Sequence, residues 1–96
     1  MMVRLVRFGL GEGKGEVAKG LAGDLVPAIA ARPGCQSVIC FGDDDEGEYG
    51  LFVVWDTQEN ADAAASVIRP KLEQHLQGNI TSPPDARLFD VLGHAP

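Results

Sequence analysis

The residues that could carry chemistry are few and scattered along this 96-residue sequence. His75 shares a predicted helical face with Leu72 and Leu76 by the i, i+3, i+4 rule, so it could face a cavity. A partly exposed histidine without a catalytic role is the simpler interpretation. Arg7 stands in an otherwise apolar stretch, where it could bind an anion, pair with Asp90, or lie at a surface. Which interpretation holds for His75 and for Arg7 depends on the helices and strands that position these side chains.

Two runs look like ligand-binding loops but lack the required pattern. A phosphate-binding Walker loop within the glycine run 9–15 would need glycine in place of Phe8 and Ser or Thr in place of Gly15. The acidic run 43–48 lacks the glycine and glutamate spacing of a calcium-binding EF-hand loop. We interpret the first as a loop that could cover a pocket and the second as a solvated hairpin turn.

The two cysteines are expected to be free thiols. Cys35 and Cys40 lie five residues apart in one predicted strand, which places them on opposite faces, too far apart for a disulfide. Neither His75 nor His94 is close to them in sequence. No metal site is therefore expected.

Composition limits the class of protein and its partners. The chain has 8 Lys and Arg against 14 Asp and Glu, a net charge of −6, and its basic residues are scattered, so neither nucleic acid nor an anionic membrane is expected as a partner. No apolar run approaches the ~20 residues that span a bilayer, and the first residues do not resemble a signal peptide. We expect one compact soluble domain over residues 1–96, located in the cytoplasm.

Apolar spacing predicts the element order β-α-β-β-α-β. The predicted strands are residues 2–8, 35–41, 49–55 and 86–92, with Pro83-Pro84 as a spacer before the last. One helix is predicted over 16–32, and a second is capped by Asp56 and divided at Pro70. This order is the ferredoxin-like α+β arrangement, a four-stranded antiparallel sheet with both helices on one face.

The strands also predict how the sheet is covered. Residues 38–41 and 51–55 are nearly continuous apolar runs, whereas a strand with one face in water should alternate. Two helices can cover only one face, and soluble monomers rarely expose a large apolar patch. We therefore expect a homodimer in which two sheets pack face to face.

The sequence resembles the antibiotic-biosynthesis monooxygenase family of the dimeric α+β barrel superfamily. The resemblance rests on Pro33-Gly34-Cys35, Phe41, the segment Tyr49–Trp55, the segment Asp56–Ala61 that enters a helix, and Val91. It implies a homodimer of ferredoxin-like subunits. It also implies a pocket between sheet and helices where an aromatic polyketide, a quinol or haem is oxygenated, in some members without any cofactor.

The activity implied is a cofactor-independent monooxygenase acting on a small aromatic or quinol-like compound. A phenol or enol would lose a proton, and the resulting anion would react with oxygen while protein groups hold its charge. By this resemblance His75 is the candidate base, Arg7 a catalytic anion stabiliser, Trp55 and Phe52 pocket walls, and Tyr49 and Arg87 further anion-binding side chains.

Departures from the family leave alternatives open. The haem-degrading branch has Asn in its first strand and a haem-ligating His nearer the Trp, whereas here only Trp55 matches, so no cofactor is expected. One alternative is a non-catalytic small-molecule-binding or structural homodimer whose pocket is filled by its own side chains. Another is a regulatory module with ligands at the subunit interface, which depends on whether Arg7 and His75 face a cavity or the partner.

Overall fold

The computed structural model describes all 96 residues and confirms the predicted α+β, ferredoxin-like order. In chain order the elements are β1 (Met2–Gly9), α1 (Gly15–Ala30), β2 (Cys35–Asp43), β3 (Glu48–Trp55), α2 (Gln58–Leu76) and β4 (Ser82–Asp90). None of the helices combines the length and apolar character needed to cross a membrane.

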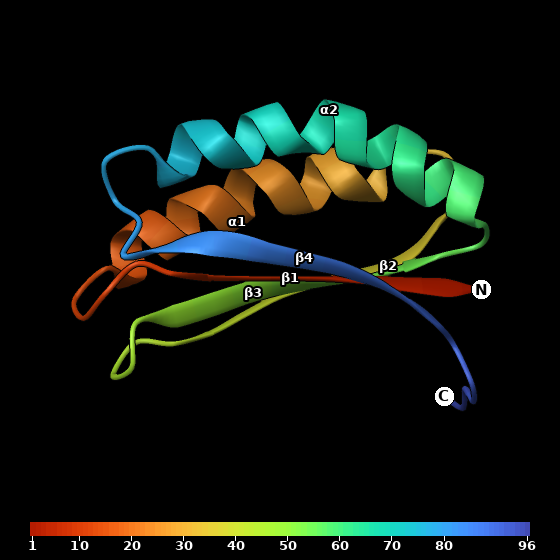
Figure 1. Cartoon of the computed structure of the whole chain (residues 1–96), viewed down its shortest axis with the longest axis horizontal. Coiled ribbons are helices and arrows are strands. Elements are labelled where there is room, and N and C mark those ends of the chain that lie inside the picture. Colours follow the sequence, from red (N-terminus) through yellow and green to blue (C-terminus); the bar gives the residue numbers. More distant parts are fainter.

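The four strands form one antiparallel sheet in the order β2-β3-β1-β4, and both helices cover the same face of it (Figure 1). The register pairs Leu5 with Phe52 on one side and with Arg87 on the other. Because side chains alternate along a strand, these three residues share one face. Arg4 and Val6 point the other way, toward the helices.

The core lies between the helices and the sheet. Each helix turns one apolar stripe inward, and the buried side chains include Leu21, Leu25 and Ile29 of α1, Ala61, Ala64, Ile68, Leu72 and Leu76 of α2, and Phe8, Tyr49, Leu51, Val53 and Trp55 of the sheet. No polar or charged residue is fully buried. Burial of these apolar surfaces is therefore the main force that holds the helices on the sheet.

The start and course of α2 differ from the prediction. The helix is continuous through Pro70, because its buried stripe continues across that position and proline removes only one helical hydrogen bond. Thr57 is the N-cap, its hydroxyl oxygen accepting from the Asn60 backbone N–H at 3.2 Å. Asp56 instead accepts from the Asn60 side-chain amide at 2.8 Å, which lowers the pKa of Asp56.

The last strand begins earlier than predicted. β4 starts at Ser82 and includes Pro83-Pro84, which the sequence suggested as a spacer. β4 is an edge strand, and Pro83-Pro84 lie where its register against β1 shifts between Arg7 and Gly9, so two residues without an N–H are tolerated there. The strand ends at Asp90, and beyond it Leu92 is 97 % exposed.

The prediction that the cysteines lie on opposite faces is wrong. The pairing of β2 with β3 shifts by one residue between Cys35 and Ser37, and this irregularity brings Cys35 and Cys40 to the same side, against the core. Both are free thiols, and burial raises the pKa of each.

The glycine-rich loop after β1 is fixed to the β2–β3 hairpin. The Gly47 carbonyl accepts from the backbone N–H groups of Leu10, at 2.8 Å, and Gly11, at 3.3 Å. Gly47 has φ +69°, and a Cβ placed on it would lie 2.3 Å from the Gly11 carbonyl carbon. Only glycine fits this close contact between the two loops.

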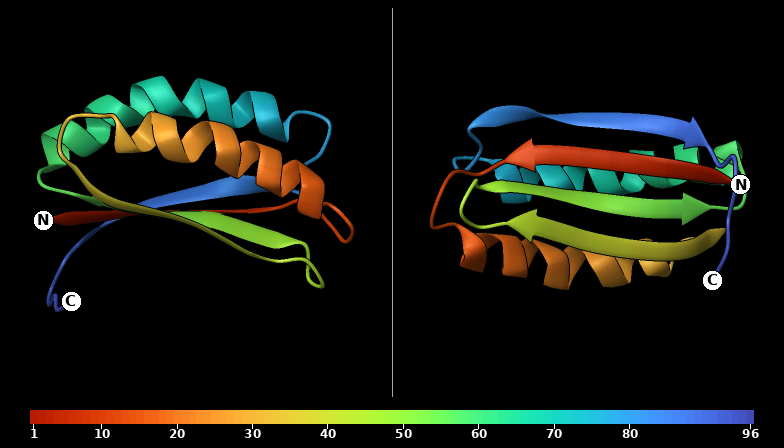
Figure 2. Two further views of the ribbon diagram at one scale, coloured as in Figure 1. Left: turned by 180° about the vertical axis from the view of Figure 1, so that it is seen from behind. Right: turned by 90° about the horizontal axis from the view of Figure 1, so that it is seen from below.

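The second face of the sheet has no cover within the chain. Figure 2 shows the strands from this side, with both helices behind them. The exposed apolar side chains on this face are Ile39, Phe41, Phe52 and Phe89, which are 53, 41, 38 and 41 % exposed. We call this surface the open face.

Candidate functional site

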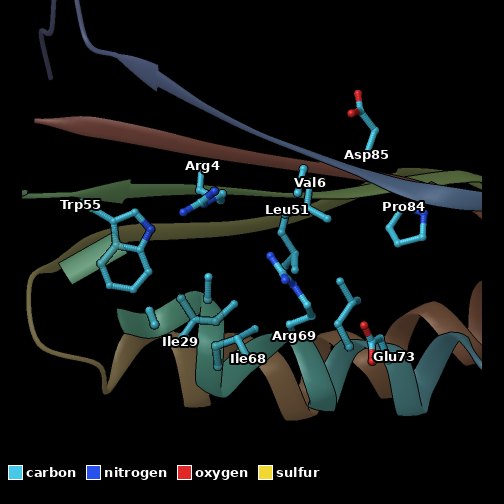
Figure 3. Close-up of a pocket in the computed structure, with 14 residues that line it drawn as sticks. Arg4, Val6, Ile29, Leu51, Trp55, Ile68, Arg69, Glu73, Pro84 and Asp85 are labelled. Carbon is cyan, nitrogen blue, oxygen red and sulfur yellow. The ribbon is translucent and has the colours of Figure 1, made fainter. Parts of the chain in front are cut away.

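A cavity of about 430 Å³ lies between the sheet and the helices (Figure 3). Nine of its 14 lining residues are hydrophobic. The larger apolar side chains of the wall are Val6, Leu51 and Trp55 from the sheet and Ile29, Ile68 and Leu72 from the helices. Its size falls within the range of roughly 300–1,000 Å³ typical of small-molecule pockets.

Small side chains leave this volume open. Ala64 and Ala65 of α2 and Ala86 of β4 all line the cavity, as does Pro84. Most of β4 is exposed even though it lies in the same sheet as the core strands. The helices therefore cover β1 and β3 more closely than β4, and the cavity occupies the space on the β4 side.

Four charged residues line the cavity. Arg4 of β1 is 19 % exposed and donates to Asp62 of α2 at 3.1 Å. Arg69 extends from α2 toward the sheet, and Glu73 follows it one helical turn later. Asp85 points away from the cavity on the far side of β4 (Figure 3). Two cationic side chains thus face an apolar space in a chain of net charge −6.

Of the residues predicted from the sequence, Trp55 is the one that lines the cavity. It ends β3 on the helix side, is 3 % exposed, and lies at the same end of the cavity as Arg4 (Figure 3). An indole in this position presents a broad flat surface to whatever enters.

His75 is not among the lining residues. Its Nε2 lies 2.8 Å from Oδ2 of Asp24 on α1, and Lys71 lies 3.6 Å from the same carboxylate. The hydrogen bond from His75, more than the charge of Lys71, lowers the pKa of Asp24. Leu72 and Leu76 occupy the buried stripe, so His75 joins the two helices instead of entering the cavity.

Arg7, Phe52 and Arg87 lie on the open face, on the opposite side of the sheet from the cavity. Arg7 pairs with Glu48 at 3.4 Å, and Arg87 lies over the ring of Phe89 at 5.4 Å. The pairing of Arg7 with Asp90 considered from the sequence does not occur, because the register places Asp90 opposite Met2.

Tyr49 faces the helices but lies near the hairpin end of β3, away from the cavity lining. Its hydroxyl donates to Oδ1 of Asp44 at 2.5 Å. This hydrogen bond, together with burial and the charge of Asp44, raises the pKa of Tyr49 to about 12. A phenol so strongly held in its neutral form is suited to a structural role.

Arg4 and Arg69 line the cavity but were not predicted as site residues from the sequence. Arg4 could have been found from the alternation of side chains along the strand. It lies on the same face as Val6 and Phe8, whereas Arg7 lies on the opposite face. The signal for Arg69 was weaker: it lies four residues after Ala65, beside the buried stripe of α2.

No family model matches the sequence, and no curated protein matches it. Among solved structures, a candidate antibiotic biosynthesis monooxygenase from Nitrosomonas europaea has a TM-score of 0.82 and 17 % identity, over 97 % of this chain and 100 % of that one. Rv0793 from Mycobacterium tuberculosis has a TM-score of 0.76 and 18 % identity, over 99 % and 98 %. The chain has the antibiotic biosynthesis monooxygenase fold.

One structure with the monooxygenase fold carries a metalloporphyrin. A mutant of MhuD, with two manganese protoporphyrin IX molecules bound per active site, has a TM-score of 0.78 and 15 % identity, over 100 % of this chain and 99 % of that one. The present cavity does not fit a haem, because no His, Cys, Met or Tyr lines it to supply an axial ligand. No group of three or more His, Cys, Asp and Glu residues could hold a metal ion either.

Proposed function

We propose that the protein is a cofactor-independent monooxygenase that acts on a small aromatic or quinol-like compound. The observation that carries the proposal is the apolar cavity in which Trp55 and the cationic Arg4 lie at the same end. The monooxygenase fold supports it, because solved structures named for this activity share that fold.

The proposed reaction needs no electron donor besides the substrate. A quinol and one molecule of O₂ give the hydroxylated quinone and one molecule of water. One oxygen atom replaces a ring hydrogen and the other leaves as water. The four electrons that reduce O₂ come from the quinol, two from its oxidation to the quinone and two from the carbon that gains the oxygen atom.

The side chains of the cavity have separate parts in this proposal. Trp55 packs against the aromatic ring of the substrate. Arg4 uses one N–H group on Asp62, and its remaining N–H groups favour the phenolate over the phenol, because a nearby positive charge lowers the pKa of an acid. The apolar wall keeps water from one side of the bound substrate, which strengthens that electrostatic contact. The roles first assigned to His75 and Arg7 are not part of this proposal, since neither residue lines the cavity.

Oxygen consumption with a naphthohydroquinone tests the proposal, after subtraction of autoxidation without protein. Labelled ¹⁸O₂ should place one atom in the product. Arg4→Met should lower kcat/KM by about 100-fold or more, as expected for loss of a group that stabilises developing charge. Lys19→Met is the control, because it removes an exposed cation of α1 that does not line the cavity, and it should leave the rate unchanged.

The alternative is a non-catalytic small-molecule-binding or structural protein of the same fold. Binding of naphthols or hydroquinones in the cavity without protein-dependent oxygen consumption would favour it and contradict the oxygenase. A structural protein whose own side chains fill the pocket is disfavoured, because the cavity between sheet and helices is open. A cytoplasmic location and the absence of a cofactor remain predictions.

We also propose that two copies pair through their open faces. The face is apolar at its centre, and it carries charges of both signs at Arg7, Glu48, Asp85 and Arg87, so a two-fold contact could match them. Patches of this kind on soluble proteins usually mark interfaces. Arg7 would then face the partner copy, which is the arrangement that an interface-binding regulatory module would need.

A further inference from the structure

Arg69 is a cationic side chain without a partner. The five ion pairs of the structure join Arg4 to Asp62, Arg7 to Glu48, Lys19 to Glu16, and both Lys71 and His75 to Asp24. Arg69 takes part in none of them and donates no side-chain hydrogen bond, although the chain has 14 acidic residues. Its guanidinium group is therefore free to bind an anion.

Arg69 is placed so that an anion bound to its guanidinium group would lie in the cavity. It lies on α2 between Ala65 and Glu73, which line the same wall, and extends toward Leu51 of the sheet (Figure 3). Both neighbours on the buried side, Ile68 and Leu72, are apolar. Arg69 itself is exposed, so an anion bound to it would have apolar side chains on one side and solvent on the other.

No other charged residue of the cavity forms an ion pair with Arg69. Arg4 is already paired with Asp62, and Asp85 points away from the cavity. Glu73 does not come within ion-pair distance of Arg69, although an i, i+4 spacing on a helix would permit such a pair. Because Glu73 is the remaining carboxylate on the helical wall, it weakens the attraction of Arg69 for anions without abolishing it.

We propose that Arg69 binds the carboxylate of an aromatic acid whose ring occupies the apolar cavity. This rests on the proposed function and narrows it, since the substrate becomes a hydroxylated aromatic carboxylate. A guanidinium group offers two parallel N–H donors that match the two oxygens of a carboxylate. A phosphate would require further donors, and no second unpaired cation lines the cavity.

A matched pair of probes tests the proposal. 2-Naphthoate and 2-naphthylmethanol have the same ring and differ in charge, and their binding can be followed by calorimetry and by quenching of Trp55, the single tryptophan. Naphthoate should bind about tenfold or more tightly than the alcohol, as expected for a charge-assisted hydrogen bond. The preference should fall as salt concentration rises.

Four variants show which residue causes the preference for naphthoate over the alcohol. Arg69→Met should remove it by weakening naphthoate binding at least tenfold while changing binding of the alcohol less than twofold. Arg69→Lys should keep part of it. Glu73→Gln should strengthen naphthoate binding alone. Lys19→Met, at an exposed position of α1 that does not line the cavity, is the control and should change neither probe.

The outcomes separate this inference from the proposed function. A preference that survives in Arg69→Met, equal binding of both probes, or binding of neither overturns the inference. Equal, Arg69-independent binding would still be compatible with a neutral quinol substrate. Conversely, Arg69-dependent binding of naphthoate, without oxygen consumption when a dihydroxynaphthoate is supplied as substrate, would support the anion site and overturn the oxygenase.

Discussion

Tyr49 shows how one side chain can link three parts of the molecule. Its ring is 5 % exposed and lies over Gly42 of β2, where a Cβ would fall 2.1 Å from a ring carbon. Its hydroxyl donates to Asp44 in the hairpin, and the Asp44 carboxylate also lies against Gly15 at the start of α1. The phenol thus fixes the hairpin beside the first turn of the helix.

The ionisation of Tyr49 should reflect this contact. Its absorbance at 295 nm should titrate near pH 12, because ionisation would place a negative charge beside Asp44 and lose the hydrogen bond. Since the folded-state pKa is raised, the stabilisation is complete below pH 10 and is lost as pH rises from 10 through 12. Tyr49 is the single tyrosine, so the signal is unambiguous.

Two variants separate the cause of this shift from a general effect of the hairpin charge. Asp44→Ala should return the titration of Tyr49 toward pH 10, and Asp45→Ala should leave it near 12. Ionisation near pH 10 in the folded wild-type protein, with Trp55 fluorescence unchanged, would contradict the assigned hydrogen bond.

At the residue scale the site could be predicted only in part. Trp55 was identified because a strand-ending aromatic is conspicuous in the sequence. His75 was misplaced because helical spacing puts it near the buried stripe but does not say to which side it turns, and Asp24, 51 residues away, decides that. Arg7 was predicted as a site residue and Arg4 was not. Side chains alternate along a strand, so the two arginines lie on opposite faces, but this alternation was not used to choose between them.

At the scale of elements, the contact between Gly47 and the loop after β1 closes one end of the sheet. The same loop was suggested as a cover for the pocket, but no residue from 10 to 14 lines the cavity. Leu10 is 1 % exposed, so the loop is anchored by a buried side chain as well as by its backbone. It contributes to stability and not to the site.

Gly47→Ala should destabilise the protein by more than the cost of its backbone conformation. A left-handed backbone costs a residue with a Cβ about 1–2 kcal/mol, and at Gly47 the added atom would also displace Gly11. Gly78→Ala is the matched control, because Gly78 has φ +78° and nothing within 4 Å of the added Cβ. Urea unfolding followed by Trp55 fluorescence measures both; equal losses would contradict the close contact.

The order and type of all six elements followed from the sequence, because hydrophobic periodicity carries that information. The boundaries that failed are those set by tertiary context. Pro70 lies inside α2 because packing outweighs one lost hydrogen bond. Pro83-Pro84 belongs to a strand because β4 is at the edge, and edge position depends on strand order, which no local pattern reveals.

At the scale of the whole molecule, the open face decides how many copies act together. Phe52 lies near its centre, between Leu5 of β1 and Ile39 of β2. Burying these side chains against a second copy would remove apolar surface from water, which favours association.

Phe52→Lys should therefore weaken or abolish the dimer. Light scattering of the wild-type protein should give twice the chain mass of 10.2 kDa. The mass of the variant should fall toward that of a single chain. Val67→Lys is the control, since Val67 is also exposed, at 44 %, but lies on α2 away from the open face. A wild-type protein that is monomeric at micromolar concentration would contradict pairing through this face.

The two prolines of β4 limit assembly of another kind. A sheet with two free edges can add strands from other molecules without end, which is how fibrils grow. At one edge of this sheet Pro83-Pro84 removes an outward N–H at the start of β4, whereas the β2 edge contains no proline. The β4 edge is therefore the poorer template at this end, and addition of a strand from another molecule is expected to favour the β2 edge.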